Sequence, residues 1–494
     1  MNLLIRADAD ETIGSGHVMR CLALATKARE QGMSVHFAST DLSPRMARCI
    51  ADRNFAMHCI DAVRGSSRDR EMSSQIAAML DADWVILDGY AFEESFRLSL
   101  RDDLDDLQAS LLCIDDRGGD YDCADLVLNQ NLYADADLYT GIAASKLLLG
   151  PRFSLLRPQF DEWRGWTREV RDVVQRLLVL SGADPKHSMH RVVEKLGGLL
   201  DPSVQVDVVG VQPPDPDLVA TANQRFRFHG HVDRVANLMA EADVAIATAG
   251  GLCSELLFMQ LPALVIPVAD NQRPVAAELA RIPGYFAFDS PIDGAAIGSR
   301  LEQHQDVKLR RQAAQCARRR IDGRGAHRVV RSLKGKMLRI RRCERADCRL
   351  LWRWANEPVV RQLAFDQEPI PWSDHRRWFA DKLRDDHTHI YIGETRNGRP
   401  LGQVRLEVDP SSHAVISISV DPDFRSGGFG WLLLRSVLNS APEEIRTFHA
   451  YIKPDNEPSL NLFRSLQFHC LGEASYQQQR AVHFVYSRAQ QGAA

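Results

Sequence analysis

The chain has 494 residues, of which 45% are hydrophobic and 26% charged, with a formal net charge of −4; these values predict about three soluble globular domains. The slightly negative net charge argues against a basic surface that would bind nucleic acid along the whole chain. We recognise no signal peptide and no apolar run of about 18 residues, so we expect no membrane insertion. The ten cysteines lack zinc-ligand spacing, which predicts free thiols in a reducing cytoplasm and no metal.

Residues 1–157 alternate apolar runs with helical patterns, which is typical of an open parallel sheet. The predicted strands are residues 2–7, 35–38, 84–87, 111–114 and 126–128. Between the first strand and a helix that runs to about residue 31, Gly14 and Gly16 precede His17. A helix N-terminus favours anions, and an imidazole exchanges a proton near neutral pH. His17 is therefore a candidate catalytic group; the alternative is that it only caps the helix.

Acidic residues follow two later strands of this first sheet. Asp88 and Tyr90 come directly after the strand 84–87, and Asp115-Asp116 follow the strand 111–114. Carboxyl ends of parallel strands face the ligand crevice in such sheets, so these side chains are candidate site residues. The alternative is that either acidic segment forms only an Asx turn.

A second series of strands and helices is predicted over residues 158–332, with strands at residues 177–180, 204–209, 226–228, 244–247 and 264–268. Glycine turns follow two of these strands, and backbone N–H groups in such turns can cradle a diphosphate. Glu255, one turn into the helix, is placed to accept hydrogen bonds from ribose hydroxyls. The residues that are candidates for binding a nucleotide or a sugar are Gly182, Gly250, Gly251, Leu252, Glu255, Asn271 and Gln272.

The segments IRADADETIGSGHVMRCLALA, WVILDGY, LLGPRFSLLRPQF, ATAGGLCSELL and VADNQ together resemble the UDP-2,4-diacetamido-2,4,6-trideoxy-β-L-altropyranose hydrolases of pseudaminic acid biosynthesis. The resemblance covers about residues 1–330 and implies two Rossmann-like lobes in a GT-B-like arrangement, with UDP held mainly by the second. It also implies His17 as the catalytic residue, with Tyr90 and Asn271 near the sugar and Glu255 near the nucleotide. Asp88 and Tyr90 are further catalytic candidates, and Gly14, Gly16 and Arg20 are candidates for binding the substrate. The family's usual histidine between the aspartate and the tyrosine is Gly89 here.

The Arg-rich segment 308–331 is interpreted as the exposed face of an amphipathic helix, and Lys334-Gly335-Lys336 as a basic connector. A separate domain is predicted over residues 337–488, with strands at 390–393, 402–408 and 414–420. Its segment Arg425-x-x-Gly428-x-Gly430 follows a strand and opens an apolar helix, and it resembles the acyl-CoA loop of the GNAT N-acetyltransferases. The resemblance implies an α+β fold and an acetyl-CoA site built from Val420, Arg425, Gly427, Gly428, Phe429, Gly430, Asn456 and Ser459.

One position departs from the GNAT pattern. Many members carry a tyrosine where this chain has Phe463, and a phenyl ring cannot protonate a departing thiolate. Water or Tyr451 would have to replace it, or the domain binds acetyl-CoA without turnover. Glu407 and His413 are candidates for accepting the amine proton.

The two resemblances concern consecutive steps, since acetylation of the 4-amino group of a UDP-sugar precedes removal of UDP. The sequence therefore predicts a bifunctional cytoplasmic enzyme that feeds nonulosonic acid synthesis for surface or flagellar glycans. The expected ligands are a UDP-activated diacetamido sugar, its 4-amino precursor and acetyl-CoA. The alternatives are a GT-B glycosyltransferase and a UDP-sugar or acetyl-CoA binding module.

Overall fold

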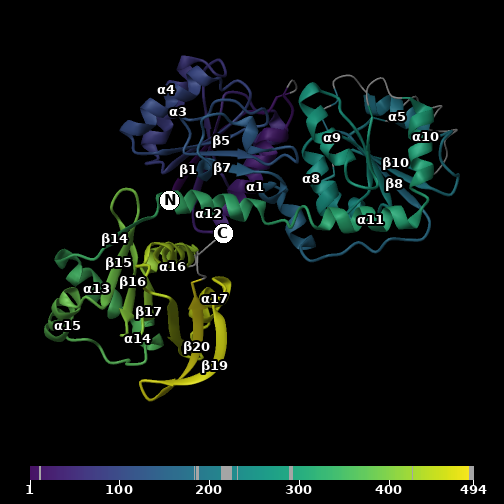
Figure 1. The fold of residues 1–494 in the computed structure, drawn as a ribbon. Coiled ribbons are helices and arrows are strands. Elements are labelled where there is room, and N and C mark those ends of the chain that lie inside the picture. Colours follow the sequence, from purple (N-terminus) through teal and green to yellow (C-terminus); the bar gives the residue numbers. More distant parts are fainter. Residues whose placement is uncertain are drawn as a thin grey trace. The chain divides into compact units, whose positions relative to one another are not determined.

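The computed structural model describes residues 1–10, 13–182, 184, 188–212, 225–230, 232–288, 293–425 and 427–488. The chain divides into two compact units, residues 1–330 and 331–494 (Figure 1). The first unit contains two separate parallel sheets, and the second contains one mixed sheet. This is the predicted fold: two Rossmann-like α/β sheets followed by a GNAT-type α+β domain. The division of the first unit at residues 157/158 stays a prediction.

The first sheet has the strand order β3-β2-β1-β4-β5-β6-β7, and all its pairs are parallel. The helices α3 and α4 pack on one face through Ala77, Phe96 and Leu100 (Figure 1). Chain order reverses between β1 and β4, which is where such sheets bind ligands. The elements are β1 (Asn2–Ala7), α1 (Gly16–Glu30), β2 (Ser34–Ser39), α2 (Pro44–Ala51), β3 (Ala56–Cys59), α3 (Ser67–Met79), β4 (Trp84–Asp88), α4 (Glu94–Asp106), β5 (Ser110–Ile114), β6 (Leu126–Asn129), and β7 (Leu147–Leu149), with short 3-10 turns after β6.

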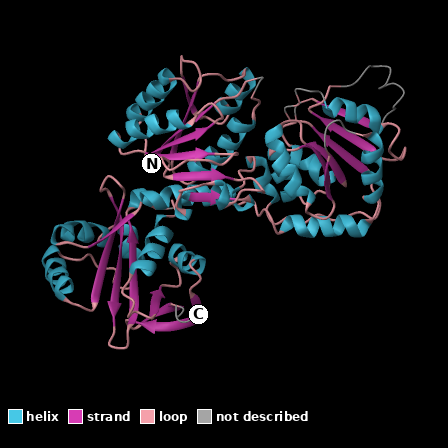
Figure 2. Ribbon diagram, turned by 45° about the horizontal axis from the view of Figure 1, so that its top comes forward, coloured by secondary structure: helices cyan, strands magenta, loops and turns pink. Residues whose placement is uncertain are grey.

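The second sheet repeats this plan with the order β10-β9-β8-β11-β12-β13. The helices α5 and α10 pack on one face and α8 and α9 on the other (Figures 1 and 2). Its order reverses between β8 and β11. The elements are β8 (Arg176–Leu180), α5 (Ser188–Leu196), β9 (Gln205–Val209), β10 (Phe226–His229), α7 (Val235–Glu241), β11 (Val244–Thr248), α8 (Gly251–Phe258), β12 (Ala263–Ile266), η5 (Asp270–Gln272), α9 (Arg273–Ala280), β13 (Tyr285–Ala287), α10 (Gly294–Gln303), α11 (Val307–Arg318) and α12 (Gly325–Met337).

The sheet of the second unit has the order β14-β15-β16-β17-β18-β20-β19. Its pairs are antiparallel except β17 with β18, which pair in parallel only from His413–Val415 to Thr447–His449. The helices α16 and α17 cover one face, and α13 and α15 the other. The elements are β14 (Arg339–Arg342), α13 (Cys348–Ala355), α14 (Pro358–Leu363), α15 (Trp372–Arg384), β15 (Thr388–Glu394), β16 (Pro400–Val408), β17 (His413–Val420), α16 (Phe429–Ser440), β18 (Thr447–Ile452), α17 (Glu457–Ser465), β19 (His469–Tyr476) and β20 (Gln479–Ser487).

The structure refines two expectations about the basic segments. The Lys334-Gly335-Lys336 connector belongs to the last turn of helix α12, and Lys334 is only 1% exposed. The segment 308–331 spans helix α11 and the start of α12; Arg311, Arg318, Arg319 and Arg320 are exposed, as expected of an amphipathic helix, but Arg310 is buried. The Arg310 guanidinium donates to the carbonyls of His304, Arg171 and Asp172, so it joins the end of helix α10 to the segment before β8.

Candidate functional site

The order reversal of the first sheet brings His17 and Asp88 together. Helix α1 starts at Gly16, and the turn before it is closed by Asp10, whose carbonyl accepts from the Gly14 N–H at 3.0 Å. Gly14 has a φ of 74°, which favours glycine. Asp88 ends β4, the neighbour of β1. His17 Nδ1 therefore lies 2.6 Å from Asp88 Oδ1, although 71 positions separate the two residues.

Arg20, one turn along α1, holds the carboxylate of Asp88 in place. Its Nε and Nη2 donate to the two oxygens of Asp88 at 2.6 Å each, and its Nη1 donates to Asp116 Oδ1 at 2.8 Å. Burial alone would raise the pKa of Asp88, but Arg20 and His17 outweigh burial and hold that pKa well below its usual range. Asp88 is therefore ionised at neutral pH and can only accept hydrogen bonds.

An ionised Asp88 selects one tautomer of His17. Because the carboxylate accepts at Nδ1, the ring proton is on Nδ1 and the lone pair is on Nε2. Arg20 Nη2 also lies 3.2 Å from Nδ1, but its shorter contact is to Asp88. An imidazole oriented in this way by a carboxylate is the arrangement of a general base. His17 is not a simple N-cap, because the cap residue of α1 is Ser15.

Tyr90 lies beside His17 and joins the two sheets of the first unit. Its ring meets the imidazole edge to face at 4.9 Å, and its hydroxyl donates to Asp116 Oδ2 at 3.0 Å. Asn271, on η5 of the second sheet's region, donates from Nδ2 to the same hydroxyl at 3.0 Å. Burial, together with the charge of Asp116, raises the pKa of Tyr90 to about 12. The phenol therefore keeps its proton at neutral pH.

The sequence left the acidic pair after β5 open between a site and a turn, and the structure divides it. Asp115 forms the turn, since it accepts from the backbone N–H groups of Arg117 at 3.1 Å and Gly118 at 2.6 Å. Asp116 belongs to the site through Arg20 and Tyr90. Sequence reasoning missed Arg117, whose guanidinium lies over the Tyr90 ring at 4.1 Å. In the sequence, only the position of Arg117 directly after the acidic pair Asp115-Asp116 could have indicated that it lies at the site.

At the order reversal of the second sheet, the contacts that the structure describes for the predicted site residues come from glycine turns. Gly182 follows β8, and its N–H donates to Thr248 Oγ1, at the end of β11, at 3.0 Å. Gly250 caps helix α8 with a φ of 143°. Gln272 accepts from the Val268 N–H at 3.0 Å and fixes the next loop. Gly251 and Leu252 form the first turn of α8; Ala183, in the predicted turn after β8, lies outside the described residues.

Glu255 does not face an open ligand site in this conformation. Both of its oxygens accept from Arg157, at 2.6 Å from Nε and 2.5 Å from Nη2, and the residue is 6% exposed. The pair links the start of helix α8 to the segment that connects the two sheets. To accept hydrogen bonds from ribose hydroxyls, Glu255 would have to use the same two oxygens that already accept from Arg157.

In the second unit, the predicted acyl-CoA loop joins β17 to helix α16. Gly428 is the N-cap of α16 and has a φ of 78°. A Cβ on Gly427 would lie 3.3 Å from the Phe429 ring and 3.4 Å from Lys334 Nζ, so the loop is closely packed there. Gly430 lies against the side chain of Val420. Ser426 lies outside the described residues.

The other predicted acetyl-CoA residues have partners within the fold. Arg425 donates from Nε to the Val420 carbonyl at 3.0 Å and from Nη2 to Glu357 Oε2 at 2.7 Å. Asn456 is the N-cap of α17, and its Oδ1 accepts from the Ser459 N–H at 3.2 Å. These contacts stabilise the two loops; direct contact with acetyl-CoA stays a prediction.

Phe463 is 2% exposed and packs edge to face with Phe468 at 4.9 Å, so it belongs to the hydrophobic core. Tyr451 lies on the other face of β18, stacked on His483 at 4.4 Å. Of the two candidate bases, Glu407 is paired with Lys382 at 2.6 Å and His413 lies 3.7 Å from Asp409. Phe463, where the resemblance leads us to expect a tyrosine, is thus a core residue.

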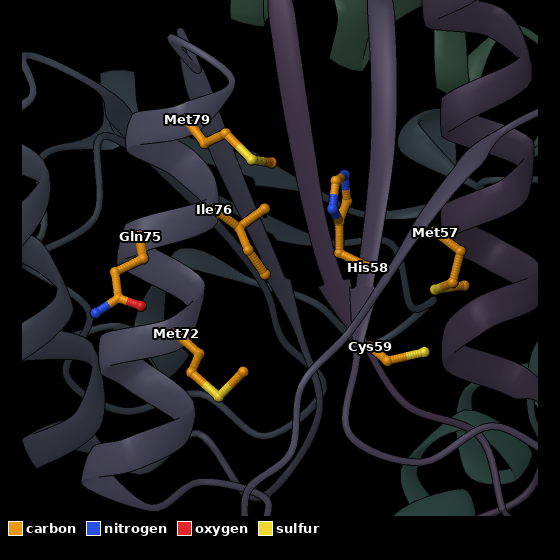
Figure 3. A pocket seen from close by; sticks show the side chains of 7 residues that line it. All are labelled: Met57, His58, Cys59, Met72, Gln75, Ile76 and Met79. Carbon is orange, nitrogen blue, oxygen red and sulfur yellow. The ribbon is translucent and has the colours of Figure 1, made fainter.

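A hollow of about 490 Å³ lies away from these sites, between β3 and α3 (Figure 3). Its lining includes Met57, His58 and Met72, and none of the predicted site residues. Within the described ranges, no cluster of three or more His, Cys, Asp or Glu side chains could hold a metal ion, and no helix is long and apolar enough to cross a bilayer.

The second unit carries a GNAT acetyltransferase domain: the model of the acetyltransferase (GNAT) family matches residues 352–468. Among solved structures, a spermidine N-acetyltransferase from Vibrio cholerae in complex with CoA and spermine is 17% identical, with a TM-score of 0.30, over 31% of this chain and 98% of that one. An aminoglycoside acetyltransferase, AAC(6')-Ib, in complex with coenzyme A is also 17% identical, over 31% of this chain and 95% of its own, with a TM-score of 0.28.

The first unit is distantly similar to a nucleotide-sugar hydrolase. The UDP-2,4-diacetamido-2,4,6-trideoxy-β-L-altropyranose hydrolase of Campylobacter jejuni is 24% identical over 57% of this chain and 97% of its own length. An uncharacterized protein of Methanocaldococcus jannaschii, MJ1062, is 22% identical over 95% of this chain and 96% of its own. The similarity to MJ1062 therefore spans both units of this chain.

Proposed function

We propose that the first unit hydrolyses a UDP-linked 2,4-diacetamido-2,4,6-trideoxy sugar and that His17 is its general base. In this step, His17 Nε2 takes a proton from water as the water oxygen bonds to the anomeric carbon. The bond from that carbon to the phosphate oxygen breaks, and UDP leaves with the electron pair. The single observation that carries the proposal is the 2.6 Å contact between His17 Nδ1 and ionised Asp88, which directs the basic nitrogen away from the carboxylate.

The neighbouring residues support this assignment of roles. Tyr90 keeps its proton and, with Asn271, presents polar groups next to the imidazole. We propose that Gly182, Gly250, Gly251, Leu252 and Gln272 bind the UDP moiety through the N–H groups at the turn and helix start, which suit a diphosphate. Arg20 acts on the reaction by holding Asp88, since three of its N–H groups are already donated to carboxylates.

Hydrolysis in water enriched with oxygen-18 tests the hydrolase function proposed for the first unit. Attack at the anomeric carbon places the label in the released sugar, whereas attack at phosphorus places it in UDP, and mass spectrometry separates the two. UDP release is followed by phosphorus NMR. Release that requires an added acceptor alcohol would instead support a glycosyltransferase, and binding without turnover would support a binding module.

We further propose that the second unit transfers the acetyl group of acetyl-CoA to the 4-amino group of a UDP-4-amino-4,6-dideoxy sugar. The amine nitrogen bonds to the thioester carbonyl carbon and loses a proton to water, Glu407 or His413, and the carbon–sulfur bond breaks. The departing thiolate takes a proton from water or from Tyr451, since Phe463 has none to give. The family match over residues 352–468 supports the acetyl donor, and the hydrolase similarity of the first unit supports the acceptor. Thiol release with acetyl-CoA and the 4-amino sugar tests this half; thiol release that does not depend on the sugar would contradict it.

A further inference from the structure

The acyl-CoA loop has a charged neighbour from a helix that precedes the GNAT match in sequence. Lys334 belongs to the last turn of α12, outside residues 352–468. It is 1% exposed, and its ammonium group donates to the carbonyl oxygen of Gly427. The same nitrogen lies 5.2 Å from the centre of the Phe429 ring. A buried cation thus sits directly against the loop.

The packing of α12 fixes this position. In the same helix turn, Gly335 faces the side chain of Leu432, where a Cβ would come within 3.7 Å, and Arg331 lies over the Trp431 ring at 4.4 Å. The end of α12 therefore lies along the first turn of α16. Burial in this contact lowers the pKa of Lys334 to about 8, so a large part of the population still carries the charge at neutral pH.

The chemistry of the contact favours an anion on the opposite side of the loop. The Gly427 carbonyl and the Gly428 N–H belong to one planar peptide unit, so a cation on the oxygen polarises the N–H and makes it a better donor. Gly428 is also the N-cap of α16, where the first N–H groups have no partner within the helix. The ammonium also adds its own positive charge to the loop, and that charge attracts an anion bound there.

We propose that Lys334 is a positioning residue for the diphosphate of acetyl-CoA, acting through the Gly427–Gly428 peptide. The proposal rests on the acetyltransferase function proposed above. It adds to the acetyl-CoA site that the sequence predicts, in which Arg425 donates to the Val420 carbonyl and to Glu357. It also moves the functional boundary of the GNAT domain upstream, into helix α12.

Calorimetric binding of CoA and of pantetheine, which lacks the diphosphate, to the full-length protein tests the proposal. Lys334→Met should weaken CoA binding about tenfold, the loss typical of a charge-assisted hydrogen bond, and leave pantetheine binding unchanged. Lys334→Arg, which keeps the charge, should restore part of the affinity. Lys336→Met removes the same charge from an exposed position of the same helix and should match the wild-type protein.

The pantetheine arm distinguishes this role from a merely structural one. Equal weakening of CoA and pantetheine binding by Lys334→Met would overturn the proposal, because a deformed loop and not a lost charge would then explain both. Equal CoA affinity of Lys334→Met and Lys336→Met would also overturn it. Failure of the wild-type protein to bind CoA would overturn both this proposal and the acetyltransferase function.

Discussion

The two parallel sheets of the first unit share one topology but place different chemistry at the same point. At the order reversal of the first sheet, between β1 and β4, the side chains are ionisable: His17, Asp88 and Arg20 form one network. At the order reversal of the second sheet, between β8 and β11, the contact is neutral, from the Gly182 N–H to Thr248 Oγ1. In the function proposed above, the first sheet supplies the proton chemistry and the second supplies neutral donors for an anion.

The strongest test of this difference is His17→Ala. Loss of the base should lower the rate constant for UDP release by about 10³-fold, within the range for a general base, and leave UDP binding nearly unchanged. Phosphorus NMR measures the rate and calorimetry the affinity. His58→Ala, on the edge strand β3, is the control and should match the wild-type rate. Equal UDP release by both variants would remove the first sheet's proposed role.

Asp88→Asn should have the next largest effect. An amide no longer forces the proton onto His17 Nδ1, and it leaves Arg20 without its carboxylate, so we expect the rate to fall about 10²-fold or more. Removing one partner of a buried ion pair also costs about 3–5 kcal/mol of stability. Thermal unfolding measured beside the rate separates the two effects. A folded variant with an unchanged rate would show that the dyad does not orient the base.

Gly250→Ala tests the second sheet. Its φ of 143° is rarely adopted by residues with a Cβ, so the substitution should shift the N–H groups at the start of α8. We expect the Kd for UDP to rise about tenfold, an effect of about 1.4 kcal/mol, with a much smaller change in the rate at saturation. Gly197→Ala, where a Cβ meets open space, is the control. A loss of rate as large as that of His17→Ala would contradict the proposal that the second sheet acts in binding and not in proton transfer.

Thr248→Val should have the smallest effect. The substitution removes the acceptor of the Gly182 N–H without changing the side-chain volume greatly, and the loss of one such hydrogen bond costs about 1 kcal/mol. Urea unfolding should show that decrease, and the Kd for UDP should rise less than for Gly250→Ala. A larger effect on the rate constant than on binding would argue that the second sheet takes part in the chemistry.

In the first unit, every predicted strand except β10 is a central strand of its sheet. β4 and β5 are buried along their whole length and appear as continuous apolar runs. In the first unit the missed strands are β3, β7 and β13, which are edge strands of three or four residues and are partly exposed. In the second unit β14, β19 and β20 were also missed. A strand of only three or four residues gives a weak pattern, which is hard to tell from that of a loop.

The candidate site divides in the same way. Glycine turns and the residues after strands were visible because a tight turn has a local chemical signature. The partners of these residues could not be predicted in the same way. No local pattern indicates that Glu255 pairs with Arg157, or that Tyr90 accepts a hydrogen bond from Asn271, which is 181 positions away. Acidic residues after strands were ambiguous for this reason, and only their partners separated Asp115 from Asp116.

The sequence by itself determined the class of fold, the glycine turns before three helices and the presence of His17 at one of them. These features are local, since they depend on burial pattern and on the backbone angles of a few residues. Only the tertiary structure decided that Asp88 fixes the His17 tautomer and that Lys334 supports the acyl-CoA loop. Strand order and helix packing bring these groups together, and neither can be read from the spacing of residues along the chain.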